Sequence, residues 1–157
     1  IYGFIGIAGF YFNPQGKING KWYNLQPLGT EGQGIKPGTK KYSRISIAIP
    51  IGVGARWQID ERFTAGLEIG YRKTFTDYID DVSTEYYDNK MIENTSGQIG
   101  AALDDPNKNN FAGQLDQNGN TQCGLQRGNP NEKDAYFFTT LVIGIKINKV
   151  KKLSSKY

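Results

Sequence analysis

The sequence predicts an all-β fold, an antiparallel up-and-down transmembrane β-barrel, on three observations. First, the chain has 20 Gly, 10 Tyr and 8 Phe, but one Met, one Cys and no His. This composition is typical of antiparallel β-proteins. Second, several segments alternate apolar and polar residues over membrane-spanning lengths. Third, the connections between these segments follow a long, short, long order, as in outer-membrane barrels.

The first strand is expected over residues 1–12. Both sets of alternating positions are largely apolar there, so the pattern assigns no face to this strand. The alternation is already under way at Ile1, and no signal peptide precedes it. We therefore expect these residues to be a piece of a longer precursor.

The clearest strand is expected over residues 42–59. Its odd positions are apolar, whereas its even positions are small or cationic. The odd positions are Ile45, Ile47, Ile49, Ile51, Val53, Ala55 and Trp57. A strand in a soluble domain has only about 5 or 6 residues. A period-two pattern of this length therefore favours a membrane-spanning strand.

A third strand is expected over residues 63–78, after a tight connection at 60–62. Its apolar side holds Phe63, Ala65, Leu67, Ile69, Tyr71 and Phe75. The faces of the two strands match across this hairpin only when paired residue numbers have an even sum. Every such register places Glu68 opposite or diagonal to Arg56, which predicts an inward ion pair.

Arg44, Arg56, Glu68 and Arg72 form the predicted ion network of the lumen. One interpretation is a selectivity or gating filter in a pore. The other is a charged plug that fills a narrow barrel. With about eight strands the lumen is only wide enough for side chains to fill it. The sequence therefore favours a plugged interior over a conducting channel.

The fourth strand is expected over residues 135–147, followed by a basic tail at 148–157. The long loops at 13–40 and 80–134 are expected to be extracellular, which places the short turn and the tail in the periplasm. Acidic residues outnumber basic ones between residues 80 and 134, whereas lysines gather in the tail. The two ends of the molecule are thus predicted to carry opposite charge.

Several classes of function are disfavoured. The net charge is +4, but the basic residues outside the tail are scattered, which argues against nucleic-acid binding. Without His, and with Cys123 as the single cysteine, common nucleophile–base pairs and zinc clusters are absent. We therefore expect no enzyme activity, cofactor, metal or small-molecule substrate. No apolar run reaches the roughly 18 residues that a membrane helix needs.

Two loop segments are weaker candidate sites. Residues 116–120 resemble the start of a calcium loop, but Arg127 occupies the twelfth position, where Glu is expected. A solvated loop is the preferred interpretation. Trp22 and Tyr23 are candidate partner contacts, although packing within the loop is favoured over that role. Cys123 is either a free thiol or paired with residues outside this chain.

Three runs of the sequence carry a family resemblance. They are GFYFNP at 9–14, WYNLQPLGTEGQG at 22–34 and LEIGYRKTFTDY at 67–78, and Tyr136-Phe137-Phe138 fits the same pattern. Together they resemble the PorG-like outer-membrane β-barrel family of Bacteroidota. The resemblance covers most of the chain and is weakest in the middle of the second long loop.

The resemblance implies a barrel of about eight strands, of which this chain holds the C-terminal four. It also implies a scaffold role in the type IX secretion system, anchoring the periplasmic PorK/PorN ring at the outer membrane. Lys149, Lys151 and Lys152 are then the candidate periplasmic contact, and membrane lipid is the other partner. The alternatives are a small transport or ligand-binding barrel of the outer membrane, and a soluble β-barrel or sandwich.

Overall fold

The computed structural model describes residues 1–106 and 114–147. It consists mostly of antiparallel β-sheet, so the predicted all-β class is confirmed. The strands are β1 (Tyr2–Ile5), β2 (Ala8–Tyr11), β3 (Gln15–Ile18), β4 (Lys21–Asn24), β5 (Ile45–Gln58), β6 (Phe63–Thr74) and β7 (Ala135–Ile145), and the helix is α1 (Asn89–Asp104).

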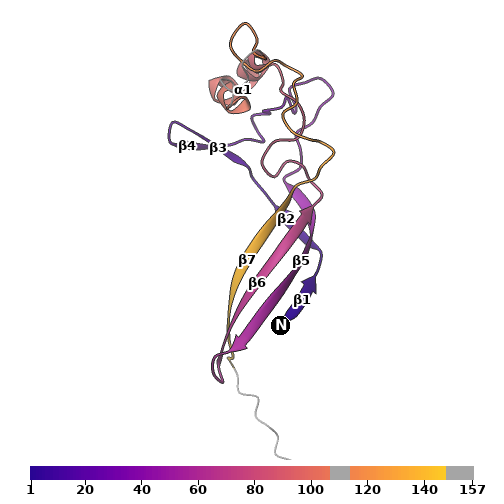
Figure 1. The fold of residues 1–157 in the computed structure, drawn as a ribbon. Helices are drawn as coiled ribbons and strands as arrows, with labels where there is room; N and C mark the ends of the chain where they lie inside the picture. Colours follow the sequence, from indigo (N-terminus) through magenta and orange to yellow (C-terminus); the bar gives the residue numbers. More distant parts are fainter. Residues whose placement is uncertain (107–113, 148–157) are drawn as a thin grey trace, which may run out of the picture. The chain divides into compact units, whose positions relative to one another are not determined.

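The main sheet has the strand order β1-β5-β6-β7, and β2 also pairs with β5. β5, β6 and β7 run side by side as its long strands (Figure 1). β6 and β7 are paired from Phe63↔Ile145 to Lys73↔Ala135. Within the part of the chain that the structure describes, β1 and β7 form the two edges of this sheet.

The short connection between β5 and β6 is a side-chain-stabilised turn. Asp60 Oδ1 accepts hydrogen bonds from the backbone amides of Arg62 (2.6 Å) and Phe63 (2.8 Å). Ile59 N donates to Phe63 O at 2.9 Å and closes the hairpin. An aspartate that caps its own turn allows two long strands to reverse direction within a few residues.

The chain divides into two compact units. The strand unit comprises Ile1–Ala8, Ile49–Lys73 and Ala135–Tyr157, and the loop unit comprises Gly9–Ala48 and Thr74–Asp134. The short turn belongs to the strand unit, and both long connections belong to the loop unit.

Side-chain burial in the strand unit is the reverse of that in a soluble domain. The odd positions of β5 are exposed almost throughout, and the glycines of its even positions are covered. β1 follows the same rule, with Tyr2 and Phe4 half-buried and Ile5 exposed. The structure thus assigns the faces of the first strand, which the sequence pattern leaves open.

The loop unit has a small core of its own. The buried apolar side chains of the described residues are Phe12, Leu25, Ala48, Tyr86 and Ile92, and all belong to this unit. Helix α1 contributes Ile92, which is fully buried. Its N-cap is Asp88, whose side chain accepts from Met91 N, and it bends at Gly97, where φ is 72°.

The structure revises several predicted boundaries. The strand predicted over 1–12 is two short strands, β1 and β2, and β6 ends at Thr74 rather than at residue 78. The predicted long loops contain the β3–β4 hairpin and α1. The hairpin register joins Lys17 to Trp22 and Gly16 to Tyr23. Both elements are short or interrupted, so their periodicity is weak in the sequence.

Candidate functional surfaces of the sheet

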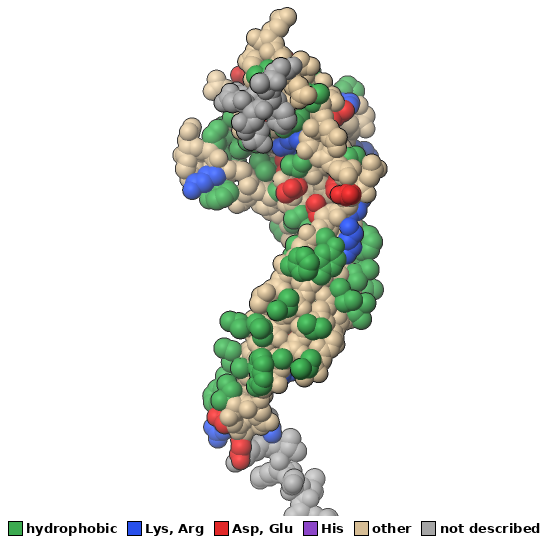
Figure 2. Space-filling model, in the orientation of Figure 1, with side chains coloured by type: hydrophobic (Ala, Val, Ile, Leu, Met, Phe, Trp, Pro, Cys, Tyr) green, Lys and Arg blue, Asp and Glu red, His purple; other side chains and the backbone are tan. Residues whose placement is uncertain are grey.

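One face of the strand unit is apolar and exposed, and we call it the apolar face. On the side seen in Figure 2, hydrophobic side chains are spread over the strands. The largest exposed members are Ile5, Ile7, Ile49, Ile51, Val53, Trp57, Phe63, Ile69, Phe137, Leu141, Ile143, Ile145 and Ile147. Contiguous apolar surfaces of this kind mark contact with a membrane or another protein. No helix among the described residues is long and apolar enough to cross a membrane.

The opposite face of the strand unit carries aromatic rings that lie over glycines. A Cβ atom at Gly52 would lie 2.5 Å from the Phe4 ring and 2.4 Å from the carbonyl oxygen of Ile69. At Gly70 it would lie 2.5 Å from the Phe138 ring. The rings of Phe4 and Phe138 are themselves in contact, with centroids 6.2 Å apart. Glycine is therefore required where these rings cross the strands.

Glu68 lies on this opposite face and binds Tyr2. The Tyr2 hydroxyl donates to Glu68 Oε1 at 2.5 Å, and the Arg56 guanidinium lies 5.7 Å from the centre of the Tyr2 ring. The predicted Glu68–Arg56 ion pair is not among the ion pairs of the described residues. The physical reason is that β1 pairs with β5 and places Tyr2 opposite Gly54, where its ring and hydroxyl contact both charged residues.

Arg72 is enclosed by aromatic side chains. Its NH1 atom donates to the Tyr136 hydroxyl at 3.0 Å, and its guanidinium lies 4.8 Å from the centre of the Phe138 ring. Aromatic faces attract a cation electrostatically and do so more strongly when water is excluded. The buried Arg72 Nε atom has no hydrogen-bond partner. Arg72 therefore helps to fill the opposite face instead of pairing with Glu68.

Arg44 belongs to the loop unit, where it has separate partners. Its NH1 atom donates to Asn13 Oδ1 at 3.1 Å, and its guanidinium lies 5.4 Å from the centre of the Tyr11 ring. The structure thus places Arg56 and Glu68 around Tyr2, Arg72 among aromatic rings, and Arg44 beside Asn13. The four residues do not share one set of contacts.

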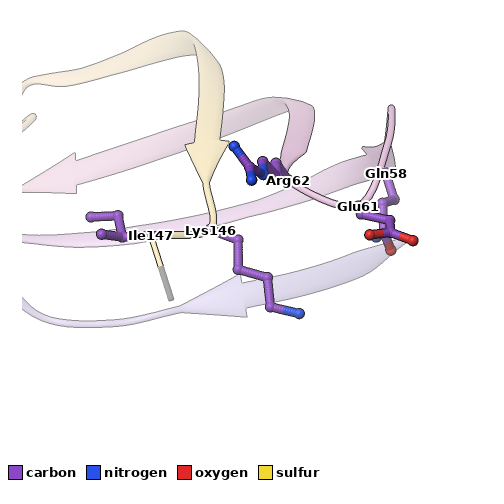
Figure 3. Close-up of a pocket in the computed structure, with 5 residues that line it drawn as sticks. All are labelled: Gln58, Glu61, Arg62, Lys146 and Ile147. Atoms are coloured by element: carbon purple, nitrogen blue, oxygen red, sulfur yellow. The ribbon is translucent and has the colours of Figure 1, made fainter. Parts of the chain in front are cut away.

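A pocket of about 290 Å³ lies at the turn end of the strand unit. Figure 3 shows the five labelled side chains that line it, from the end of β5, from the β5–β6 turn and from the segment that follows β7. They are Gln58, Glu61, Arg62, Lys146 and Ile147. Lys149, Lys151 and Lys152, the predicted tail contact, lie outside the described residues.

The loop unit is held together by a buried polar network. Glu31 accepts hydrogen bonds from Ser83 N (2.9 Å) and Thr84 Oγ1 (2.9 Å), and it forms an ion pair with Arg127 (3.3 Å). Asp81 accepts from Tyr42 (2.6 Å) and from Thr30. Burial raises the pKa of both Asp81 and Tyr42. The two predicted loops are therefore joined by paired and hydrogen-bonded groups.

The predicted partner residues Trp22 and Tyr23 differ in exposure. Trp22 is 61% exposed, and Lys17 Nζ lies 5.5 Å from the centre of its ring. Tyr23 is half-buried on the other face of the hairpin, where it pairs with Gly16, which packs against Leu103 of α1. Packing thus accounts for Tyr23, and Trp22 is left as the accessible aromatic side chain of the pair.

The comparisons with known proteins add one match. Residues 31–102 match a family described as a domain of unknown function, DUF6089. The matched range is less than half of the chain and includes β5, β6 and most of α1. No curated protein and no solved structure matches the chain.

The remaining candidate residues lie in the loop unit. Asp116 Oδ1 accepts from the backbone amides of Asn118 (2.8 Å) and Asn120 (2.9 Å), which lowers the pKa of this exposed carboxyl. Cys123 is exposed and unpaired. Within residues 1–106 and 114–147, no group of three or more His, Cys, Asp or Glu side chains is arranged to hold a metal ion.

Sequence reasoning missed two sets of residues. Tyr2, Tyr136 and Phe138 complete the opposite face, but their alternation signal is weak because their neighbours are also apolar or aromatic. Glu31, Asp81 and Arg127 are far apart in the sequence, and only the fold brings them together. The one available sequence signal for the first set is the recurrence of glycine at even positions of β5 and β6, which marks close approach by large rings.

Proposed function

We propose that this chain is part of a transmembrane β-barrel of the bacterial outer membrane, with its apolar face against lipid. One observation carries the proposal: the strand unit exposes its large apolar side chains, while Glu68, Arg72 and the rings of Tyr2, Phe4 and Phe138 lie on the opposite face. A barrel strand alternates in this sense, apolar toward lipid and polar toward the lumen. In the proposed barrel of about eight strands, the edges at β1 and β7 pair with further strands.

The interior of the proposed barrel is occupied by side chains. Tyr2 bound to Glu68, and Arg72 enclosed by Tyr136 and Phe138, would lie in the lumen. Small barrels are filled in this manner, whereas channels of porins have many more strands. These contacts support a structural role over ion or solute conduction.

We further propose that the barrel is a scaffold of the type IX secretion system and anchors the periplasmic PorK/PorN ring. This proposal rests on the resemblance of the runs at 9–14, 22–34 and 67–78 to the PorG-like family. In the proposed topology the long loops at 13–40 and 80–134 are extracellular, and the short turn and the basic tail are periplasmic.

Membrane insertion is tested with the full-length protein in cells. We expect it to fractionate with the outer membrane, to require detergent for extraction and to migrate faster on gels before heating than after it. Recovery in the soluble fraction without detergent would overturn the barrel proposal. Ion conductance of the purified protein in planar bilayers would instead favour the transport alternative.

The scaffold role is tested by co-purification with the periplasmic ring. A variant with Lys149, Lys151 and Lys152 changed to Glu is expected to lose most of the co-purified ring while remaining in the outer membrane. The matched control changes Lys17, Lys21 and Lys40 of the loop unit to Glu and is expected to retain it. Unchanged co-purification of the tail variant would refute the tail contact, and absence of the ring from the wild-type preparation would refute the scaffold role.

A further inference from the structure

We propose that the loop unit binds a divalent cation of the calcium type between Asp104, Asp105 and Thr121. The three residues lie where the C-terminal end of α1 meets the segment around the Leu115↔Thr121 bridge. All three belong to one compact unit, so the inference does not depend on the barrel proposal.

The first observation is a pair of buried carboxylates at an unfavourable place. Asp104 is the last residue of α1 and Asp105 is its C-cap, and they are 1% and 3% exposed. The C-terminal end of a helix carries a partial negative charge, which repels carboxylates. The last turn of α1 contains no basic residue. Two buried negative groups at this end therefore need a positive charge.

The second observation is a set of three buried oxygen atoms that have no hydrogen-bond partner among the described residues. They are Asp104 Oδ1, Asp105 Oδ1 and Thr121 Oγ1. The other carboxylate oxygens are satisfied, because Asp104 Oδ2 accepts from Asn89 Nδ2 (2.9 Å) and Asp105 Oδ2 accepts from Thr121 N (2.7 Å). Buried polar atoms are almost always paired with protein, water or an ion.

The Thr121 hydroxyl supports the site independently of the two carboxylates, because it is uncharged and comes from a different segment of the chain. Thr121 is 4% exposed, and its own amide holds the Asp105 carboxylate. Covalent geometry therefore keeps Thr121 Oγ1 within about 6 Å of that carboxylate. A neutral hydroxyl without a partner and two carboxylates that each have one unpartnered oxygen are the kinds of donor that a hard cation binds.

The neighbouring charges do not supply the missing cation. Arg127 acts electrostatically on Asp104, but its NH1 atom is engaged by Glu31, Thr30 and the carbonyl of Asp81.

The donor chemistry selects the type of ion. Three oxygen donors, with neither His nor Cys among them, suit Ca²⁺ better than zinc or copper. Two carboxylates are fewer than an EF-hand provides, so we expect the affinity of an extracellular module, with Kd of about 10⁻⁴–10⁻³ M. The remaining coordination positions of such a site are usually filled by water or backbone carbonyls.

The experiment uses the full-length protein in detergent with Ca²⁺ as the ligand. Binding is measured by calorimetry, and by Tb³⁺ luminescence excited through nearby tyrosines, against Mg²⁺ and a chelator. We expect Asp105→Asn and Thr121→Val to weaken Ca²⁺ binding at least about tenfold, since each removes a donor but retains the backbone contact. Thr121→Ser restores the hydroxyl and is expected to bind as the wild type does.

Asp116→Asn is the matched control, because Asp116 begins the segment that resembles the start of a calcium loop by sequence. This variant is expected to bind Ca²⁺ normally. Loss of binding with Asp116→Asn but not with Asp105→Asn would place the ion elsewhere and overturn the proposal. So would a folded wild-type protein, checked by circular dichroism, that binds no Ca²⁺ at roughly ten times the expected Kd. Equal binding by Thr121→Val and Thr121→Ser would remove Thr121 from the site.

Discussion

At the scale of single residues, Tyr42 links an aromatic stack to the buried polar network. Its ring stacks on Tyr78 with centroids 4.4 Å apart, and its hydroxyl donates to Asp81 at 2.6 Å. Tyr42→Phe keeps the stack but leaves Asp81 Oδ1 without this donor. We expect the loop unit to lose about 1–3 kcal/mol, the cost of an unsatisfied buried acceptor. The loss is measured as a shift in the urea concentration at the midpoint of unfolding, followed by near-ultraviolet circular dichroism.

Tyr11→Phe is the control for this change, because the Tyr11 side chain is exposed and contacts Arg44 through its ring. It is expected to leave the midpoint unchanged. Equal effects of the two substitutions would show that the Tyr42 hydroxyl does not stabilise the network.

Asp81 makes the stability of the loop unit depend on pH. Burial raises its pKa from the ordinary 3.8, against the opposing effects of Thr30, Tyr42 and Arg127. Because the folded-state pKa is the higher one, the folded state binds the proton more tightly. Its contribution to stability is complete below the ordinary carboxyl pKa and is lost as the pH rises through the raised value. The free energy of unfolding is measured by urea titration at several pH values. With Asp81→Asn we expect it to fall less steeply as the pH rises. If the fall is as steep as in the wild type, another group causes it.

The contacts between individual side chains were the part of the site that the sequence predicted least well. Alternation places Arg56 and Glu68 on one face, but it does not reveal that Tyr2 lies between them. The reason is that the pairing of β1 with β5 is a long-range contact with no local signal in residues 1–12. The Glu31–Arg127 ion pair joins residues 96 positions apart for the same kind of reason.

At the scale of elements, glycines in the long strands set how closely aromatic rings approach the sheet. Gly52→Ala would place a Cβ atom 2.4 Å from the backbone oxygen of Ile69, which cannot move aside as a flexible side chain can. Overpacking of this kind costs about 1–3 kcal/mol. We therefore expect Gly52→Ala to lower the temperature at which the heat-modifiable form unfolds.

Gly9→Ala in β2 is the matched control, since a Cβ atom there meets nothing within 4 Å. It is expected to unfold at the wild-type temperature. A Gly52→Ala protein as stable as this control would show that the Phe4 ring and the strand backbone are not closely packed.

The long strands were predictable from sequence because each alternates over many residues. β5 and β7 begin and end within three residues of their predicted bounds. Helix α1 was not predicted, because Gly97 interrupts it, and its polar sequence NKMIENTSG gives little apolar periodicity. The β3–β4 hairpin was missed because each of its strands has only four residues.

At the scale of the whole molecule, the two units differ in how they bury their apolar side chains. The loop unit buries its apolar residues in the ordinary manner, around Ile92 and Tyr86. The described strand unit has no buried apolar core and leaves residues such as Leu141 and Ile143 80% and 79% exposed. Water is a poor solvent for such a surface, whereas lipid is a good one. The all-β class was predictable from the sequence because the long strands alternate apolar and polar residues over many positions.

Two adjacent residues of β7 test the proposed lipid contact, because their side chains lie on opposite faces of the sheet. Leu141 lies on the apolar face, and Thr140 pairs with Glu68 on the opposite one. Against lipid, Leu141→Arg is expected to cost about 2–4 kcal/mol near the bilayer midplane. Thr140→Arg places its charge beside the Glu68 carboxylate and is expected to cost much less. Urea unfolding in lipid vesicles, followed by heat-modifiable gel mobility, measures both. If Leu141→Arg folds as well as the wild type, or improves recovery without detergent, the apolar face does not contact lipid.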